Sequence, residues 1–231
     1  MASLESGNLT DELAASLTDR CIKYWLAGFV DLHGIPKCKS VPIAHFSDMM
    51  ADRFTFFWYM VHEIARNHDA FATFMPKPMN DRTGSAVHFN MSLSDPTSGI
   101  NFFEDSTDPR NCGLSIIGYQ FIAGVLRHAK AICAVSAPLV NSYKRLVIQG
   151  SMSGFTWAPI YICYGGNNRT NMLRIPSHGN RVECRAPDIS CNLYLAAAMM
   201  LNAGLEGIRE ELDPGAPHDE YVHLGFERTS R

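Results

Sequence analysis

Several features that would assign a function class directly are missing from this sequence. None of its 231 residues lie in an uncharged apolar run of membrane-spanning length, so no transmembrane helix is predicted. The first residues do not combine a basic segment with an apolar core, so no signal peptide is expected. The formal net charge of −3 provides no basic excess for nucleic-acid binding. We therefore expect a cytoplasmic protein whose partners include neither a membrane nor a nucleic acid.

Cysteine chemistry is not indicated either, although the chain contains seven cysteines. Their number is odd, and no two of them have the Cys-x-x-Cys spacing of zinc or redox motifs. Most lie in apolar runs such as Tyr161-Ile162-Cys163. They are predicted to be small buried side chains in a reducing compartment.

The composition is that of a globular protein, with 46% hydrophobic and 19% charged residues. A chain of this length can form one large domain together with a small one. Periodicity predicts helices at 10–20, 49–68, 114–132 and 192–212. It predicts strands on both sides of a turn at 33–36, and further strands at 72–75, 85–93, 158–163, 171–175 and 181–185. Residues 136–154 are predicted to be irregular. This pattern indicates an α+β architecture.

Arginine residues are concentrated in one stretch, 167–188, which contains four of them. If 181–185 is a strand, Arg181, Glu183 and Arg185 lie on one face and the intervening apolar residues on the other. Two cations and one carboxylate then point the same way. This arrangement is either an ion-pair ladder on a solvated sheet or a local anion site.

A second polar face is predicted on the strand at 85–93, where His88, Asn90 and Ser92 alternate with apolar residues. A single histidine on a strand is more often structural than a metal ligand. However, a basic loop at 77–85 precedes this strand, and a polar cluster occurs at 141–145. Arginine forks together with imidazole and carboxylate ligands favour a site for a polyanion with a bound metal ion.

Five motifs occur in the order that is found in glutamine synthetases. They are FMPKPMNDRTGSAVHFNMSL, NSYKRL, NNRTNMLRIP, RVECRAPD and NLYLAAAMMLNAGLEGI. The stretch DLHGIPKCKSVPIAHF resembles the small N-terminal β-grasp domain of the same family. SGFTWAP and GGNNRT resemble its type III branch, which includes γ-glutamylmethylamide synthetases. The resemblance covers residues 22–46 and 51–212.

The residues themselves predict an N-terminal helix at 1–20 and a polar tail at 213–231. Between these segments, the resemblance implies an incomplete β-grasp piece at 21–46 and a partial glutamine synthetase catalytic β-barrel or sheet with flanking helices at 51–212. Family members use ATP and Mg²⁺ or Mn²⁺ to phosphorylate the γ-carboxylate of glutamate. Ammonia or a small amine then displaces the phosphate. They assemble as rings with active sites between subunits, so a homo-oligomer is expected.

Site residues follow from the resemblance position by position. It assigns metal binding to His88 and Glu183, ATP contacts to Asn90, Ser92, Arg169 and Arg174, and glutamate binding to Arg145 and Arg185. Arg145 and Arg174 are in addition the expected catalytic cations.

The sequence departs from the family pattern at one junction. Phe46 is followed almost directly by Ala51, where the family has several further strands that carry most of its metal-binding glutamates. Among the remaining acids, no alternating acidic strand replaces them. Three interpretations stay open: an active ligase, a non-catalytic subunit that associates with a full-length synthetase, or a gene product from which a segment has been skipped.

Overall fold

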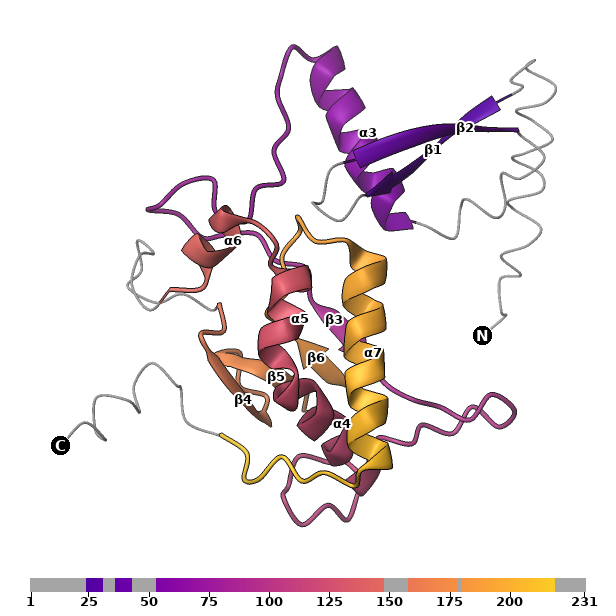
Figure 1. The fold of residues 1–231 in the computed structure, drawn as a ribbon, viewed down its shortest axis with the longest axis vertical. Coiled ribbons are helices and arrows are strands. Elements are labelled where there is room, and N and C mark those ends of the chain that lie inside the picture. The colour runs from indigo at the N-terminus through magenta and orange to yellow at the C-terminus, as the bar shows by residue number, and fades with distance from the viewer. Residues whose placement is uncertain (1–23, 31–35, 43–52, 148–157, 178–179, 219–231) are drawn as a thin grey trace. The chain divides into compact units, whose positions relative to one another are not determined.

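A computed structural model describes residues 24–30, 36–42, 53–147, 158–177 and 180–218 (Figure 1). The chain divides into two compact units, Met1–Thr73 and Phe74–Arg231. The helix predicted at 10–20 and most of the turn predicted at 33–36 lie outside the described residues.

The smaller unit contains a β-hairpin and a helix. Strands β1 (Tyr24–Val30) and β2 (Pro36–Pro42) pair in antiparallel fashion, which confirms the two strands predicted around a turn. Helix α3 (Arg53–Asn67) confirms the helix predicted at 49–68 over its described part. A β-grasp domain needs more than this hairpin, so that part of the fold stays a prediction.

Helix α3 is less buried than its aromatic composition indicates. Trp58 is only 2% exposed, but Phe57 and Ile64 are each 51% exposed. One face of this helix, which carries Phe57 and Ile64, is therefore exposed. Within the described part of this unit, a two-stranded hairpin is the only sheet available, and it can cover only one side of a helix.

The larger unit combines strands and helices, as the sequence predicts. Its described elements are β3 (Phe89–Met91), α4 (Ile116–Arg127), α5 (Ala129–Ser136), α6 (Val140–Arg145), β4 (Tyr161–Gly166), β5 (Asn171–Ile175), β6 (Val182–Cys184) and α7 (Leu193–Arg209). The strands form one sheet in the order β3-β6-β5-β4. Strands β4 and β5 are parallel, and the other neighbours are antiparallel. Closure of this sheet into a barrel stays a prediction.

Several predicted elements of this unit need correction. The strand predicted at 72–75 is wrong, because these residues have no strand neighbour in the described part of the chain. The strand predicted at 85–93 is reduced to β3, and the one predicted at 158–163 begins and ends three residues later as β4. The helix predicted at 114–132 is divided at His128, whose backbone (φ −98°, ψ 10°) departs from helical values.

The segment predicted to be irregular, 136–154, contains the short helix α6. The Ser142 hydroxyl accepts a hydrogen bond from the Leu139 amide at 3.1 Å, which fixes the start of this helix. A helix of six residues is too short to show a hydrophobic period, so the sequence pattern gave no sign of it.

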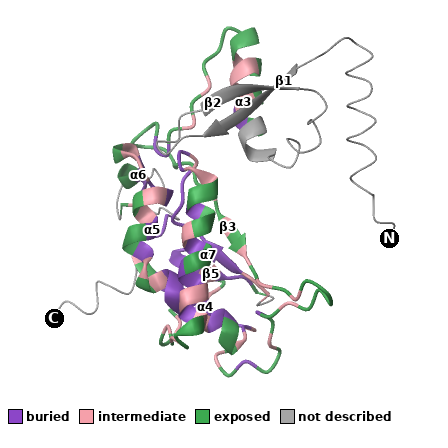
Figure 2. Cartoon of the chain, turned by 45° about the vertical axis from the view of Figure 1, so that its right-hand side comes forward, coloured by how far each residue is buried: buried purple, intermediate pink, exposed green. Residues whose placement is uncertain are grey.

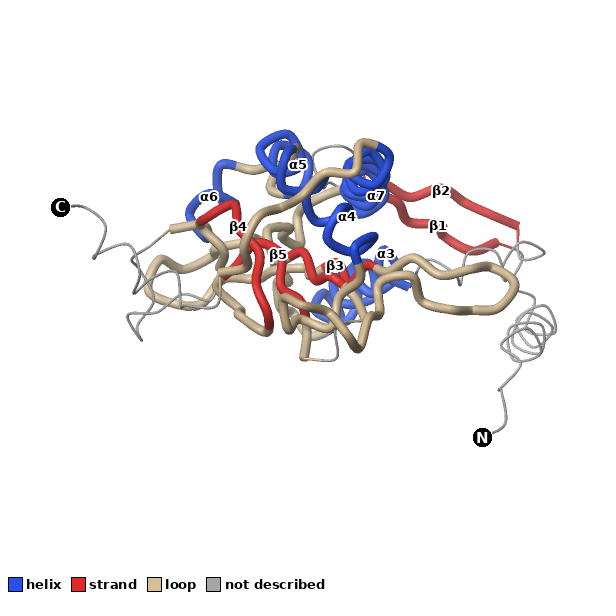
Figure 3. The backbone as a smooth tube through the Cα atoms, turned by 90° about the horizontal axis from the view of Figure 1, so that it is seen from below, coloured by secondary structure: helices blue, strands red, loops and turns tan. Residues whose placement is uncertain are grey.

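Helices α4 and α7 cover one face of the sheet, and the core lies between these layers (Figures 2 and 3). The largest side chains that are buried there are Phe103, Leu114, Phe121, Ile122, Ile132, Tyr164, Leu173, Ile175 and Met200. Each of these two helices begins at a polar cap, because Ser115 and Asn192 accept hydrogen bonds from backbone amides in the first turns of α4 and α7.

Small residues allow α4 and α7 to approach closely. A Cβ atom added at Gly124 would lie 2.0 Å from the Ala203 carbonyl oxygen and 2.8 Å from the Gly207 amide nitrogen. The backbones of the two helices are therefore in direct contact at this point.

No helix in the described residues combines the length and the apolar character needed to cross a membrane.

The contact at Gly124 predicts whether a substitution there raises or lowers the stability of the protein. Alanine normally stabilises a helix relative to glycine by about 1 kcal/mol. Gly124→Ala should instead destabilise the protein by about 1–3 kcal/mol, because the added methyl group meets the backbone of α7. Urea denaturation would measure the change. The matched variant Ala134→Gly, on the exposed face of α5, should lose only the helix-propensity contribution. An unchanged or higher stability of Gly124→Ala would contradict the proposed packing.

Candidate active site

The central strand β6 carries Glu183 on the face of the sheet that is opposite to the helices. Its neighbours Val182 and Cys184 are both 0% exposed and belong to the core. Glu183 lies opposite Asn90 of β3 and Arg174 of β5. The predicted alternation along this strand is therefore confirmed, and it places a carboxylate at the centre of the polar face.

Three side chains surround the Glu183 carboxylate, which is buried. Its Oε1 atom lies 2.9 Å from His88 Nδ1 and accepts a hydrogen bond from Arg185 Nη1 at 3.1 Å. Its Oε2 atom accepts a hydrogen bond from Arg174 Nη1 at 2.6 Å. Both oxygens are thus engaged by cationic or potentially cationic groups. A buried carboxylate is tolerated only with such compensation.

The surroundings lower the pKa values of both Glu183 and His88. Burial raises the pKa of Glu183, but the hydrogen bond from Arg174 and the charges of Arg185 and His88 outweigh burial and leave its pKa below the ordinary value. Burial and the charge of Arg185 lower the pKa of His88 below 6.5, although Glu183 opposes this shift. The favoured state near neutral pH is an ionised carboxylate beside an uncharged imidazole.

The loop between β4 and β5 is tied to this cluster. Arg174 Nη2 donates to the side-chain oxygen of Asn167 at 2.6 Å, and Arg185 Nε donates to the Arg169 carbonyl at 2.9 Å. Asn167 has a positive φ of 52°, a conformation that asparagine tolerates better than most residues. The Arg169 side chain is exposed and is attached to the site through its backbone.

The same loop is held from its other side by the segment that follows α7. The side chains of Asn168 and Asn171 donate to the His218 carbonyl at 3.3 Å and 2.9 Å. The His218 amide donates to the Tyr164 carbonyl of β4 at 2.7 Å. The loop therefore connects the polar cluster with a segment that lies close to the C-terminal end of the described residues.

Arg145 lies close to this cluster but does not contact Glu183. It is 5% exposed, and its guanidinium group donates to the carbonyls of Ala186 and Pro187. A Cβ atom at Gly84 would lie 2.9 Å from Arg145 Cγ. Burial lowers the pKa of Arg145. Its Nε atom is buried, and among the described residues it has no hydrogen-bond partner.

The structure brings together some of the predicted site residues and not others. His88, Glu183, Arg174 and Arg185 meet directly, and Arg169 joins them through its backbone. Asn90 lies beside Glu183 in the sheet. Ser92 is exposed beyond the end of β3. Within the described residues, no contact joins Ser92 or Arg145 to the Glu183 carboxylate.

Two residues of this site were absent from the predicted set. Arg181 donates from Nε to the side-chain oxygen of Asn90 at 3.1 Å, and Asn167 accepts from Arg174. Arg181 shares the predicted polar face of β6, so alternation alone could have included it. Asn167 could have been inferred only from its place in a turn-forming Gly-Gly-Asn-Asn sequence.

The donor set is consistent with part of a metal site. In the described residues, no three His, Cys, Asp or Glu side chains are grouped where they could hold a metal ion. However, adjacent ligands of Mg²⁺ at about 2.1 Å in octahedral geometry lie about 3 Å apart. The separation of 2.9 Å between His88 Nδ1 and Glu183 Oε1 fits that spacing. These two residues could supply two of the six ligands.

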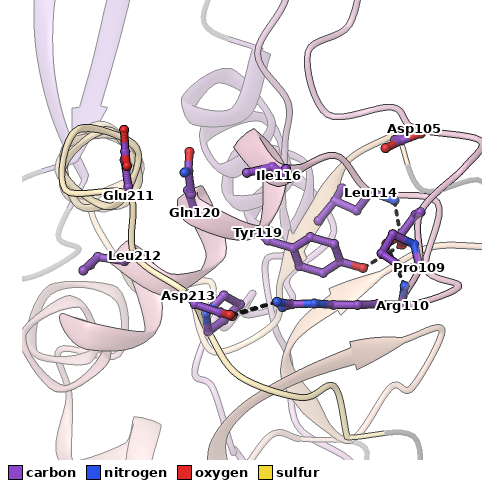
Figure 4. Close-up of a pocket in the computed structure, with 12 residues that line it drawn as sticks. Asp105, Pro109, Arg110, Leu114, Ile116, Tyr119, Gln120, Glu211, Leu212 and Asp213 are labelled. Atoms are coloured by element: carbon purple, nitrogen blue, oxygen red, sulfur yellow. Dashed lines mark hydrogen bonds and ion pairs between the residues drawn. The ribbon is translucent and has the colours of Figure 1, made fainter.

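A separate cavity of about 400 Å³ is formed by the loop before α4, the start of α4 and the segment after α7 (Figure 4). Arg110 binds both carboxylate oxygens of Asp213 at 2.9 Å and 3.0 Å. The Tyr119 hydroxyl donates to Asp108 at 2.7 Å. These two pairs of polar groups thus bind each other, and none of the Glu183 cluster lines the cavity.

Residues 44–228 match the family described as the catalytic domain of glutamine synthetase. The chain belongs to the glutamine synthetase family. It is 48% identical over 172 residues to a glutamate–methylamine ligase of Methyloversatilis universalis, covering 74% of this chain and 38% of that protein. It is 44% identical over 169 residues to a glutamine synthetase of Rhizobium meliloti, covering 73% of this chain and 38% of that protein.

Solved structures agree with this membership. A structure described as apo GmaS without ligand aligns with a TM-score of 0.67 at 33% identity, covering 96% of this chain and 49% of that one. A GmaS complex with ADP aligns with a TM-score of 0.69 at 36% identity, covering 98% and 51%. The predicted family is confirmed, and the chain spans about two fifths of the length of these curated relatives of the glutamine synthetase family.

The shifted pKa of His88 can be measured by NMR titration of its ring resonances. We expect a midpoint below 6.5, and a further decrease in Glu183→Gln, because Glu183 raises the pKa of this imidazole. Since the folded pKa is lowered, the contribution of His88 to stability is present above pH 6.5 and is lost as the pH falls through the folded value.

Glu206→Gln, which removes the partner of His128, is the matched control and should leave the His88 midpoint unchanged. A midpoint at or above 6.5 in the unmodified protein would contradict the described environment of His88.

Proposed function

We propose that the cluster around Glu183 is the phosphate, metal and glutamate side of an ATP-dependent ligase site. The reaction joins the γ-carboxylate of glutamate to ammonia or a small amine. One observation carries the proposal: His88, Arg174 and Arg185 meet at one buried carboxylate in a chain of the glutamine synthetase family.

The chemistry proceeds in two transfers. An oxygen of the glutamate γ-carboxylate attacks the terminal phosphorus of ATP, ADP leaves, and γ-glutamyl phosphate forms. The amine nitrogen then attacks the acyl carbon, loses a proton and expels phosphate. Negative charge develops on the transferring phosphoryl group, so fixed cations that need no late reorganisation stabilise it.

The arginines have distinct roles in this proposal. Arg174 and Arg169 lie on β5 and on the loop before it, and they bind phosphate oxygens. Arg185 follows β6 and binds a carboxylate of glutamate, together with Arg145. Planar guanidinium groups suit both ligands because they donate two parallel hydrogen bonds to oxygen pairs. Asn90 and Ser92 contribute nucleotide contacts from β3 and the residue that follows it.

A divalent cation, Mg²⁺ or Mn²⁺, would be held by His88 and Glu183. When bound, it neutralises part of the charge on the phosphate oxygens. The lowered pKa of His88 keeps its imidazole uncharged near neutral pH, which is the state that can bind a metal ion. The ionised Glu183 supplies a hard oxygen ligand, of the type that these ions prefer.

The relatives support this assignment. One is a glutamate–methylamine ligase, others are glutamine synthetases, and an aligned GmaS structure contains ADP. The identity is 48% to the methylamine ligase and 44% to the Rhizobium glutamine synthetase, which favours a small amine as the nucleophile.

A second candidate function is a subunit that completes its site with a longer synthetase chain. The observation that favours it is the donor count: His88 and Glu183 offer two metal ligands, whereas Mg²⁺ takes six. The relatives are more than twice as long as the part that this chain matches. Assembly with a full-length synthetase would then supply further ligands.

Nucleotide binding tests the site without requiring turnover. Arg169→Ala should weaken the binding of Mg²⁺–ADP by about 10- to 100-fold, because it removes a charged hydrogen bond to phosphate. Isothermal titration calorimetry would measure it. The stability should change little, since the side chain is exposed and Arg185 binds the backbone of residue 169.

The control Arg209→Ala removes an exposed arginine from the last turn of α7 and should leave the binding unchanged. Equal affinities of the two variants would reject Arg169 as a phosphate ligand.

Turnover tests the completeness of the site. The purified chain alone should show little or no ATP- and Mg²⁺-dependent γ-glutamyl transfer, because two protein ligands leave the metal ions of a two-metal reaction incompletely held. Phosphate release with glutamate and either ammonia or methylamine is the measurement. Robust release would show that this chain supplies a complete site and would remove the case for a longer partner.

A further inference from the structure

Arg110 connects three parts of the larger unit that are far apart in the sequence. Its Nη2 atom donates to both carboxylate oxygens of Asp213, which follows α7, at 2.9 Å and 3.0 Å. Its Nη1 atom donates to the Gly215 carbonyl at 3.0 Å and to the Tyr164 hydroxyl of β4 at 3.2 Å. The guanidinium group lies over the Tyr119 ring of α4, 4.5 Å from its centroid (Figure 4). One cation thus joins α4, β4 and the segment after α7.

The loop that carries Arg110 is itself fixed by the buried side chain of Asp108. This carboxylate accepts hydrogen bonds from the backbone amides of Arg110, Cys112 and Leu114 at 2.9 Å, 2.9 Å and 3.2 Å, and from the Tyr119 hydroxyl at 2.7 Å. Because these bonds form within the loop and to α4, they hold Arg110 in place independently of the segment after α7. Arg110 can therefore serve as a fixed anchor for that segment.

The segment after α7 is bound to β4 at both ends of one residue, Tyr164. The Tyr164 hydroxyl donates to the Gly215 carbonyl at 2.5 Å, and the Tyr164 carbonyl accepts from the His218 amide at 2.7 Å. The contact is close, because a Cβ atom added at Gly165 would lie 2.1 Å from the His218 carbonyl oxygen. The position of this carbonyl therefore depends on how the segment is held against β4.

The His218 carbonyl in turn holds the loop between β4 and β5, because it accepts from the side chains of Asn168 and Asn171. The side-chain oxygen of Asn168 accepts from the Thr170 amide at 3.0 Å and from the Thr170 hydroxyl at 2.8 Å, so the bonds of Asn168 enclose Arg169 in the turn. Since the Arg169 side chain is exposed, its direction depends on the backbone of this turn.

The segment 213–218 thus links an anchored arginine at one end to the Arg169 turn at the other. An ion pair at a protein surface usually contributes little to stability. The partners of Arg110 have a further consequence, because they continue through Gly215 and His218 to the residues on both sides of Arg169. These contacts favour a role in orienting Arg169 over a role in stability alone.

We propose that Arg110 is a positioning residue for the proposed nucleotide site. It holds the segment after α7 against β4, the segment holds the turn that contains Asn168, and the turn directs Arg169 toward the phosphates of Mg²⁺–ADP. Arg110 does not contact the nucleotide in this proposal and acts only through Arg169. The inference rests on the proposed function, because it requires Arg169 to bind phosphate.

A double-mutant cycle on the full chain tests whether Arg110 acts through Arg169. Arg110→Ala should weaken Mg²⁺–ADP binding, measured by isothermal titration calorimetry, by about three- to tenfold, because the binding-competent turn becomes a smaller fraction of the population. In the Arg169→Ala background the same substitution should change the affinity by less than about twofold. The matched control Arg127→Ala, which breaks an exposed ion pair between α4 and α7, should leave the affinity unchanged in both backgrounds.

Amide hydrogen exchange measured by NMR reports on the same turn without nucleotide. Arg110→Ala should speed exchange at the Thr170 amide by at least about tenfold. The Arg185 amide, which donates to the Met172 carbonyl of β5, should keep its native rate. Asp213→Asn leaves the bonds from Arg110 to Gly215 and Tyr164 in place, so it should change both measurements in the same direction but by less.

Unchanged exchange at Thr170 in Arg110→Ala would overturn the proposal, and so would equal weakening of Mg²⁺–ADP binding by Arg110→Ala in the two backgrounds. Faster exchange at Arg185 in both Arg110→Ala and Asp213→Asn would assign a purely structural role to the ion pair and reject positioning. If Arg169→Ala weakens binding and Arg110→Ala does not, the positioning role fails and the nucleotide site stands. If Mg²⁺–ADP does not bind the unmodified chain, the proposed function fails and the positioning role fails with it.

Discussion

The burial of one carboxylate in the central strand governs the arrangement of the polar face. Removing Glu183 from water is unfavourable unless charges and hydrogen bonds replace the lost hydration. Arg174 from β5, Arg185 after β6 and His88 before β3 provide this replacement. These residues come from three neighbouring strands or their ends, so compensating the charge also fixes the relative positions of the side chains in this cluster.

The sheet separates two environments that depend on each other. On the helical side, the glycine contact between α4 and α7 fixes the packing distance, and core side chains of β5 and β6 fill the space beneath. On the polar side, guanidinium groups extend from the same strands. Successive side chains of a strand point to opposite faces of the sheet. The packed core on one face therefore also holds the polar side chains on the other face in position.

Sequence patterns predicted the parts of the fold that depend on periodicity. Alternation at 181–185 placed Glu183 opposite Val182 and Cys184, and the strand at 171–175 was predicted with its observed bounds. Features that depend on tertiary contacts were not predictable in this way. The break at His128 and the contact between Arg174 and Asn167 require elements to meet in space. The family resemblance assigned His88, Arg174 and Arg185 to the same site as Glu183, and these three side chains contact its carboxylate. It also assigned Ser92 and Arg145 to that site, which do not contact the carboxylate among the described residues, and periodicity alone could not bring β3 next to β6.

The attachment of His218 to Asn168 and Asn171 has a consequence for motion. A short turn with a positive-φ residue is ordinarily able to fluctuate independently of distant parts of a chain. Here the turn shares hydrogen bonds with residues that follow the last helix, so releasing either segment exposes donors and carbonyls of the other. The loop that presents Arg169 and the segment after α7 should therefore open and close as one cooperative unit.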